Sequence, residues 1–155
     1  MEIFRKRPVA EYTLIDHTAD LGIRITAPDR EQLYAAAAMA MLDLINPIAY
    51  AAEADMLEIS PPGQPLVLTV EGQDRADLMV NFLREILYLY NGENRRVTDL
   101  SVTALTDRRI DAHLFWHPLD PETADIRHDI KAVTYHQIDV AARETDWVAQ
   151  VVFDV

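Results

Sequence analysis

The segment from Asp74 to Tyr90 most narrowly limits the folds open to this chain, because its apolar residues recur with the period of an α-helix. Apolar side chains stand four residues apart along one face: Leu78, Phe82, Ile86 and Tyr90. Asp74 can cap the first turn, and Asp77 places a negative charge near the positive end of the helix dipole. So continuous an apolar face has to be covered by another layer, and we expect that layer to be a β-sheet.

A second helix and several strand-like segments accompany this one. Asp29, followed three places later by Gln32, has the signature of a helix start, and an Ala-rich run leads from there to Pro47. Apolar residues alternate or cluster, as in strands, over residues 12–15, 21–26, 66–70, 97–105, 109–116, 130–140 and 147–154. Residues 51–65 lack a clear period and should form a loop. The order predicts an α+β, two-layer domain, with two helices packed on one face of a mostly antiparallel mixed sheet.

The length of 155 residues suits a single domain, which we expect to span residues 1–155. Half of the residues are apolar and 26% are charged, the ordinary balance of a globular protein. No apolar run approaches the roughly 20 residues needed to cross a bilayer, and residues 1–7 lack the apolar centre of a signal peptide. We therefore expect a cytoplasmic protein without a membrane partner.

The charge of the chain argues against tight direct binding of nucleic acid. The formal net charge is -12 at pH 7, and such a surface repels a phosphate backbone unless a local basic patch overrides it. The nearest approach to such a patch is two isolated pairs, Arg95-Arg96 and Arg108-Arg109. A role near RNA would more naturally run through a basic protein partner.

Two acidic motifs are candidates for a metal site. The chain has no cysteine, so a metal would have to be held by oxygen or imidazole nitrogen. The first motif, Asp16-His17-Thr18-Ala19-Asp20, lies between two predicted strands, and the second is the closing Asp154-Val155. Taken alone, the first is equally typical of side chains that bind turn amides, and the second of an ordinary chain end.

These motifs, with two others, resemble a known family along nearly the whole chain. The matching segments are residues 16–20 (Asp-His-Thr-Ala-Asp), the helix start at Asp74 with Asp77-Leu78, residues 131–136 (Lys-Ala-Val-Thr-Tyr-His), and residues 153–155 (Phe-Asp-Val). In this order and spacing they are similar to the archease family. The resemblance implies a cofactor protein, not an enzyme, for the RtcB-type RNA ligase, which joins 3′-phosphate to 5′-hydroxyl RNA ends in tRNA splicing and RNA repair. Such a protein promotes guanylylation of the ligase and its multiple turnover.

The resemblance also implies a metal site made by Asp20, Asp154 and the C-terminal residue Val155. Two side-chain carboxylates and one terminal carboxylate offer up to six hard oxygens, which suit Ca²⁺ best, with Mg²⁺ or Mn²⁺ as alternatives. Binding should weaken on acidification, because the carboxylates must be ionised to hold the ion. We expect His17 to have a supporting or structural role, and the role of Asp16 stays open.

Lys131 and Tyr135 are candidate contacts for the partner. If residues 130–140 form one strand, Lys131 and Tyr135 share one face, and Thr134 and His136 share the other. The residues could form a packing ladder within the sheet, or a polar surface beside the metal that touches the ligase. Both interpretations remain open at this point.

The chain departs from the family pattern in one loop. Trp116-His117 stands where archeases commonly carry a Gly-Glu pair, and residues 123–129 lack the usual Arg-His placement. His117 and His128 could form a small site of their own, although histidines in irregular loops are usually solvated. Any family role for residues 116–129 is therefore in doubt.

Two other functions fit parts of the sequence. The first is a metal-dependent hydrolase in which Asp16, His17 and Asp20 hold an ion that activates water. The remaining histidines, however, show no helical spacing of the kind found in zinc proteases. The second is a chaperone or adaptor whose acidic surface works without metal.

Overall fold

A computed structural model describes residues 12–16, 20–47, 63–120, 122 and 125–155. Two strands precede the first helix, one strand separates the two helices, and the elements after the second helix are strands. They are β1 (Tyr12–Asp16), β2 (Asp20–Ala27), α1 (Arg30–Ile45), β3 (Gln64–Glu71), α3 (Arg75–Glu93), β4 (Arg95–Leu105), β5 (Arg109–Pro118), β6 (Ala132–Val133), β7 (Asp139–Ala142) and β8 (Trp147–Asp154). Of the predicted loop 51–65, residues 51–62 lie outside the described part.

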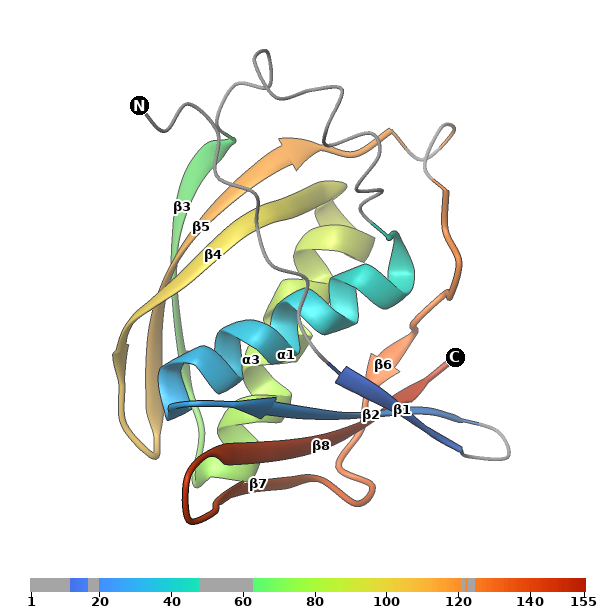
Figure 1. Cartoon of the computed structure of the whole chain (residues 1–155). Helices are drawn as coiled ribbons and strands as arrows, with labels where there is room; N and C mark the ends of the chain where they lie inside the picture. The colour runs from blue at the N-terminus through green and yellow to red at the C-terminus, as the bar shows by residue number, and fades with distance from the viewer. Residues whose placement is uncertain (1–11, 17–19, 48–62, 121, 123–124) are drawn as a thin grey trace, which may run out of the picture.

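The strands form two sheets. One has five strands in the order β1-β2-β8-β6, with β7 also paired to β8, and the other has three strands in the order β3-β5-β4 (Figure 1). Every strand pair in the described ranges is antiparallel. The predicted α+β class with two helices is confirmed, whereas the predicted single mixed sheet is replaced by two antiparallel sheets.

Both helices contact both sheets, and the core lies between these layers. Helix α1 packs on β4 of the smaller sheet and on β2 and β8 of the larger one, while α3 packs on β3, β4 and β5 and also on β6 and β7 (Figure 1). The predicted apolar face of α3 is buried throughout, from Leu78 and Phe82 to Ile86 and Tyr90. A single hydrophobic cluster therefore joins the helices to the two sheets.

The helices begin at the predicted capping residues. Asp29 accepts a hydrogen bond from the backbone N–H of Gln32 (2.8 Å), and the Gln32 side chain donates to the same carboxylate (2.7 Å). Asp74 accepts from the N–H of Asp77 (2.8 Å). These bonds satisfy N–H groups that have no partner within the helix, which fixes where each helix starts. Neither helix, in the part of the chain described, is both long and apolar enough to cross a membrane.

The predicted strand over residues 130–140 is wrong. Extended pairing is confined to β6 and β7, which pair with opposite ends of β8, and residues 134–138 turn between them. The N–H of Ile138 donates to the carbonyl oxygen of Tyr135 (3.2 Å), and Gln137 has a positive φ of 53°. The alternation expected to place Lys131 with Tyr135 therefore does not apply, because the chain is not extended from one to the other.

Tyr90 offers a test of the core. Its ring is buried at 3% exposure, and its hydroxyl is the buried side-chain polar atom that lacks a hydrogen-bond partner among the described residues. A buried unsatisfied group destabilises the folded state, so Tyr90→Phe should raise the free energy of unfolding by about 1 kcal/mol. Urea unfolding measures this change.

Tyr34→Phe is the matched control for this substitution. The buried Tyr34 hydroxyl donates to the carbonyl oxygen of Arg75 at 2.7 Å. Its removal should lower the free energy of unfolding by about 1 kcal/mol, the opposite sign to Tyr90→Phe. Equal losses from the two substitutions would contradict this account of Tyr90.

Candidate metal and partner site

The pairing of β2 with β8 brings Asp20 and Asp154 together. In the antiparallel register, Asp20 stands directly opposite Asp154, and Leu21 stands opposite Phe153. Residues opposite one another in such a pair share a face of the sheet and have Cβ atoms about 4.5–5.5 Å apart. Figure 1 shows the C-terminus at this end of the larger sheet, beside β6. Two carboxylates from distant parts of the sequence thus meet on neighbouring strands.

This acidic pair lies on the face of the sheet that points away from the helices. The adjoining residues, Leu21 and Phe153, pack in the core that contains the helices, so Asp20 and Asp154 project from the opposite face. Val152, next along that opposite face, is also fully buried but is not part of the core cluster. Asp154 is exposed and Asp20 is partly exposed. Further along the same face, Arg24 donates to the side-chain oxygen of Gln150 (2.9 Å). The carboxylates are therefore open to an ion or a partner from solvent.

The residues at this corner suit a hard cation. Like charges directly opposite across two strands destabilise a sheet, and a bound cation would relieve that repulsion. Within residues 12–16, 20–47, 63–120, 122 and 125–155, no three side chains of His, Asp and Glu gather closely enough to hold a metal. Val155 follows Asp154 directly and is 43% exposed. Val155 is the third residue that the family resemblance implies as a ligand, through its main-chain carboxylate.

Lys131 joins this corner through its backbone. Its N–H donates to the carbonyl oxygen of Asp154 (2.8 Å), and the next residue, Ala132, is the register partner of Asp154. The Lys131 side chain is exposed. The structure thus places Lys131 beside the acidic pair.

The motif at residues 16–20 is described only in part. Asp16 ends β1 and pairs with Leu21, so its backbone lies next to Asp20 in the sheet. His17 lies outside the described residues. The supporting roles expected of Asp16 and His17 stay predictions.

Tyr135 is bound to helix α3. Its hydroxyl donates to Asp77 (2.7 Å), and the guanidinium of Arg84 lies over its ring, 4.9 Å from the centroid. The other oxygen of Asp77 accepts from the N–H of Gln73 (2.8 Å). These contacts explain why the chain turns after β6, because they hold Tyr135 against the first turns of the helix. Tyr135 nonetheless remains 49% exposed.

The hydrogen bond between Tyr135 and Asp77 shifts the pKa of both groups. The Tyr135 hydroxyl and the N–H of Gln73 stabilise the ionised carboxylate and lower the pKa of Asp77. The same bond raises the pKa of Tyr135, because the hydroxyl must keep its proton to donate it. The sequence indicated Asp77 only as a helix-start residue, and its bond to Tyr135 spans 58 positions.

This bond makes part of the stability depend on pH. Because the pKa of Asp77 is lowered on folding, its contribution is present above the unfolded value of about 3.8 and is lost as pH falls through the lowered pKa. Tyr135→Phe should therefore destabilise the protein at pH 7, and the difference from the unsubstituted protein should close in strong acid. Urea unfolding across pH 2 to 7 measures it, and a difference independent of pH would contradict the assignment.

The atypical loop begins within the smaller sheet. Trp116 lies in β5, with the guanidinium of Arg95 4.5 Å from its ring centroid. His117 Nδ1 lies 3.2 Å from the hydroxyl of Thr98 on the neighbouring strand. Trp116 and His117 therefore both have contacts within the fold.

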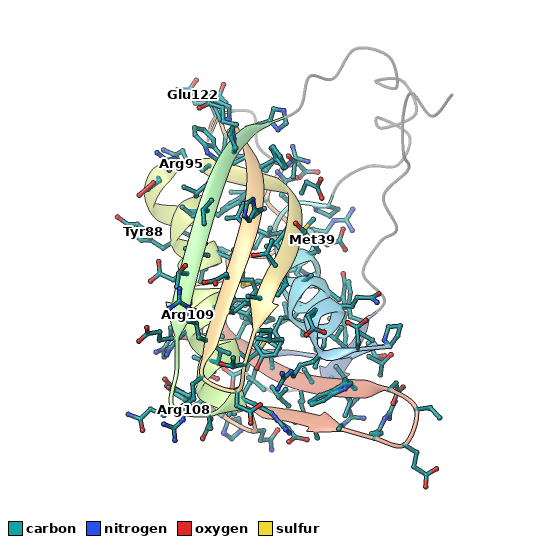
Figure 2. All side chains as sticks on the ribbon, turned by 90° about the vertical axis from the view of Figure 1, so that its left-hand side faces the viewer. Met39, Tyr88, Arg95, Arg108, Arg109 and Glu122 are labelled. Atoms are coloured by element: carbon teal, nitrogen blue, oxygen red, sulfur yellow. The ribbon has the colours of Figure 1, made fainter. Side chains whose placement is uncertain are left out.

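The two arginine pairs noted in the sequence do not combine. Arg95 pairs with Pro118 at one end of the smaller sheet, whereas Arg109 pairs with Glu71 at the other, and Figure 2 shows Arg95 and Arg108 correspondingly far apart. Arg109 also forms an ion pair with Asp111 (3.3 Å). The two pairs therefore present their charge at separate places.

A second charged cluster lies at the opposite end of β8. Asp107 bridges Arg30 and Arg75 at 2.5 and 2.9 Å, and both guanidinium groups lie near the ring of Trp147, the first residue of β8. The arginines lower the pKa of Asp107. An open hollow of about 450 Å³ adjoins this cluster. The cluster therefore links both helix starts to the β4–β5 turn and to β8.

Several known proteins are similar to this chain in sequence. The chain is 30% identical over 144 residues to the protein archease of Pyrococcus abyssi, covering 90% of this chain and 95% of the relative. It is 31% identical over 145 residues to that of Thermoplasma volcanium, with 93% and 98% covered. The chain therefore matches these relatives over almost their full length.

Solved structures share the fold. A solution structure of protein 1598 from Methanobacterium thermoautotrophicum superposes with a TM-score of 0.69 at 19% identity, covering 93% of this chain and 98% of that one. A crystal structure described as an archease, possible chaperone, from Thermotoga maritima gives a TM-score of 0.58 at 15% identity, with 97% and 98% covered. The model of the archease protein family matches residues 12–155. The chain belongs to the archease family.

Proposed function

We propose that this chain activates an RtcB-type RNA ligase as its cofactor protein, in tRNA splicing and RNA repair. The chain would promote guanylylation of the ligase and its multiple turnover, while the ligase carries out the joining chemistry in the cytoplasm. The observation that supports the proposal is the pairing of Asp20 with Asp154 beside Val155, in a chain of the archease family.

The proposed site holds one divalent cation. Asp20 and Asp154 would supply side-chain oxygens, and Val155 would supply its main-chain carboxylate. Hard oxygen donors with three formal negative charges favour Ca²⁺, with Mg²⁺ or Mn²⁺ as alternatives. A bound cation would neutralise this corner of the sheet and make it a point of attachment for oxygen groups of a partner.

The proposed partner surface surrounds this corner. Lys131 and Tyr135, both exposed, lie on the segment that leads into and out of β6. Asp16 ends β1, and His17 follows it in the sequence. A net charge of -12 favours a basic protein surface over a phosphate backbone. We therefore propose contact with the ligase itself and no strong direct contact with RNA.

Guanylylation of the ligase tests this proposal. A purified RtcB-type ligase is incubated with labelled GTP and Mn²⁺, with and without this protein, and the label that becomes bound to the ligase is followed over time. The proposal predicts faster and more complete labelling when the protein is present. Identical time courses would contradict it.

A metal-independent chaperone or adaptor is the second candidate, because the related Thermotoga maritima structure is described as a possible chaperone. The two candidates differ in their response to Asp154→Ala. The proposed activator should lose its effect on guanylylation with this substitution, whereas a metal-independent chaperone should keep it. Hydrolysis of RNA or phosphate esters by the isolated chain would instead favour the hydrolase built on Asp16, His17 and Asp20.

A further inference from the structure

Strand β6 contacts both β8 and helix α3, and the strand with the residues that flank it is hydrogen-bonded on both sides. On one side, the N–H of Lys131 donates to the carbonyl oxygen of Asp154 (2.8 Å). On the other side, the side-chain amide of Asn91 on α3 donates to the carbonyl oxygen of Ile130 (3.0 Å). The Ile130 carbonyl and the Lys131 N–H belong to the same peptide group. Asn91, this peptide group and Asp154 therefore form a continuous hydrogen-bonded chain.

A second chain of the same kind runs in parallel. Arg84 Nε donates to the carbonyl oxygen of Val133 (3.3 Å), and the N–H of Thr134, in the same peptide group, donates to the carbonyl oxygen of Val152 (3.1 Å). Arg84 and Asn91 are seven residues apart, or about two helical turns, so they project from one face of α3. The helix thus holds each end of this short strand against β8.

The first hydrogen-bonded chain ends at the backbone of the proposed metal site. The carbonyl oxygen of Asp154 belongs to the peptide group that joins Asp154 to Val155, the two residues proposed to supply metal ligands from β8. Fixing this peptide plane limits the directions in which the Asp154 side chain and the Val155 carboxylate can point. Hydrogen bonds in series also polarise one another, so a donor at one end strengthens the bond at the other.

We infer that Asn91 is a positioning residue for Asp154 and Val155, acting through the Ile130–Lys131 peptide group. This inference rests on the proposed metal site, and it assigns the control of that site's geometry to helix α3. Ile130 is 1% exposed, so loss of the Asn91 amide removes a partner from a carbonyl in a buried residue. The strand would then be held less firmly against β8, and the proposed ligands would lose orientation.

The helix supplies a closely matched control. Asn81, also on α3, donates from the same side-chain nitrogen to the carbonyl oxygen of Glu71 at the same 3.0 Å, but Glu71 lies on β3 in the other sheet. Asn81→Ala therefore removes a bond of the same length from the same helix and none that is made directly to β6 or β8. The Asn81 amide also donates to Asp77 (3.4 Å), which binds Tyr135, so Tyr135→Phe is measured beside it to account for any effect through Asp77. Asn91→Leu, which keeps most of the side-chain bulk, accompanies Asn91→Ala so that lost packing can be separated from the lost amide.

The experiment measures Ca²⁺ affinity by calorimetry and, in the metal-free protein, hydrogen exchange of the Lys131 amide by NMR. Asn91→Ala and Asn91→Leu should lower the affinity by up to about 10-fold, the low end of the loss seen when a group bonded directly to a ligand is removed, because Asn91 acts through one intervening peptide group. Both substitutions should also speed Lys131 exchange. Asn81→Ala should leave both unchanged. Equal effects of the Asn91 and Asn81 substitutions would overturn the inference.

The same measurements distinguish failure of the proposed metal site from failure of the positioning role of Asn91. If the unsubstituted protein and Asp154→Ala bind Ca²⁺ equally, the proposed site is wrong, and any influence of Asn91 on metal binding falls with it. If Asp154→Ala abolishes binding while Asn91→Ala leaves both affinity and Lys131 exchange unchanged, the site stands and the positioning role of Asn91 is overturned.

Discussion

Replacing Asp154 with alanine is expected to lower the affinity of this protein for Ca²⁺ by about 100-fold or more. The substitution removes one of two carboxylates that the sheet register places directly opposite one another. Asp20 would then face an uncharged methyl group, and the cation would lose both a ligand and a neutralising charge. Isothermal titration of the metal-free protein with CaCl₂ measures the effect.

Asp139→Ala is the control for this loss. Asp139 is an exposed aspartate on β7, paired with Gln150, and it belongs to the same sheet as Asp154 without lying at its acidic end. Its removal changes the net charge equally and should leave the affinity almost unchanged. Residues appended after Val155 should weaken binding as Asp154→Ala does, because they convert the terminal carboxylate into an amide. Full Ca²⁺ affinity in Asp154→Ala, or in the protein extended after Val155, would refute the proposed ligands.

Phe82→Ala is expected to cause the largest loss of stability, about 3–5 kcal/mol in the free energy of unfolding. Phe82 is fully buried on α3, and its ring lies 6.3 Å from that of Tyr34 on α1, at an interplanar angle of 57°. The substitution opens a cavity where the two helices meet the sheets. Urea or thermal unfolding measures the change.

Tyr88→Ala provides the comparison on the same helix. Tyr88 is 57% exposed, and Figure 2 shows it on the outside of α3, so the loss should stay within about 0.5 kcal/mol. Similar losses from Phe82→Ala and Tyr88→Ala would contradict the assignment of the core.

The helices could be predicted because the necessary information is local. Apolar spacing by four residues gave the buried face of α3, and Asp29 and Asp74 gave both helix starts. These features depend on residues within one or two turns of each other. They survive in the fold because tertiary packing favours the same conformation that the local sequence favours.

The division into two sheets could not be predicted, because strand pairing joins segments far apart in sequence. Alternation shows which residues share a face of one strand, but not which strand lies beside it. The same limit explains the error over residues 130–140, which are interrupted at residues 134–138. There the hydrogen bond from Tyr135 to Asp77 on α3 competes with continued strand pairing, and no local sequence pattern indicates this bond.

The candidate site could likewise be predicted only in part, because its geometry depends on long-range pairing. Family resemblance named Asp20 and Asp154, but a slip of one residue in the pairing of β2 with β8 would have placed them on opposite faces of the sheet. Arg84 and Asn91 were missed altogether. Polar residues on an amphipathic helix usually face solvent, so sequence gives little sign that these two side chains bind the backbone of β6.

Ligation under multiple turnover tests the central claim most directly. An RtcB-type ligase is mixed with GTP, Mn²⁺ and an excess of tRNA halves bearing 3′-phosphate and 5′-hydroxyl ends, and joined RNA per ligase is counted with this protein, with Asp154→Ala, or with neither. We expect many joined molecules per ligase with the unsubstituted protein, and about one in the other two reactions. Equal product in all three would contradict the proposed function.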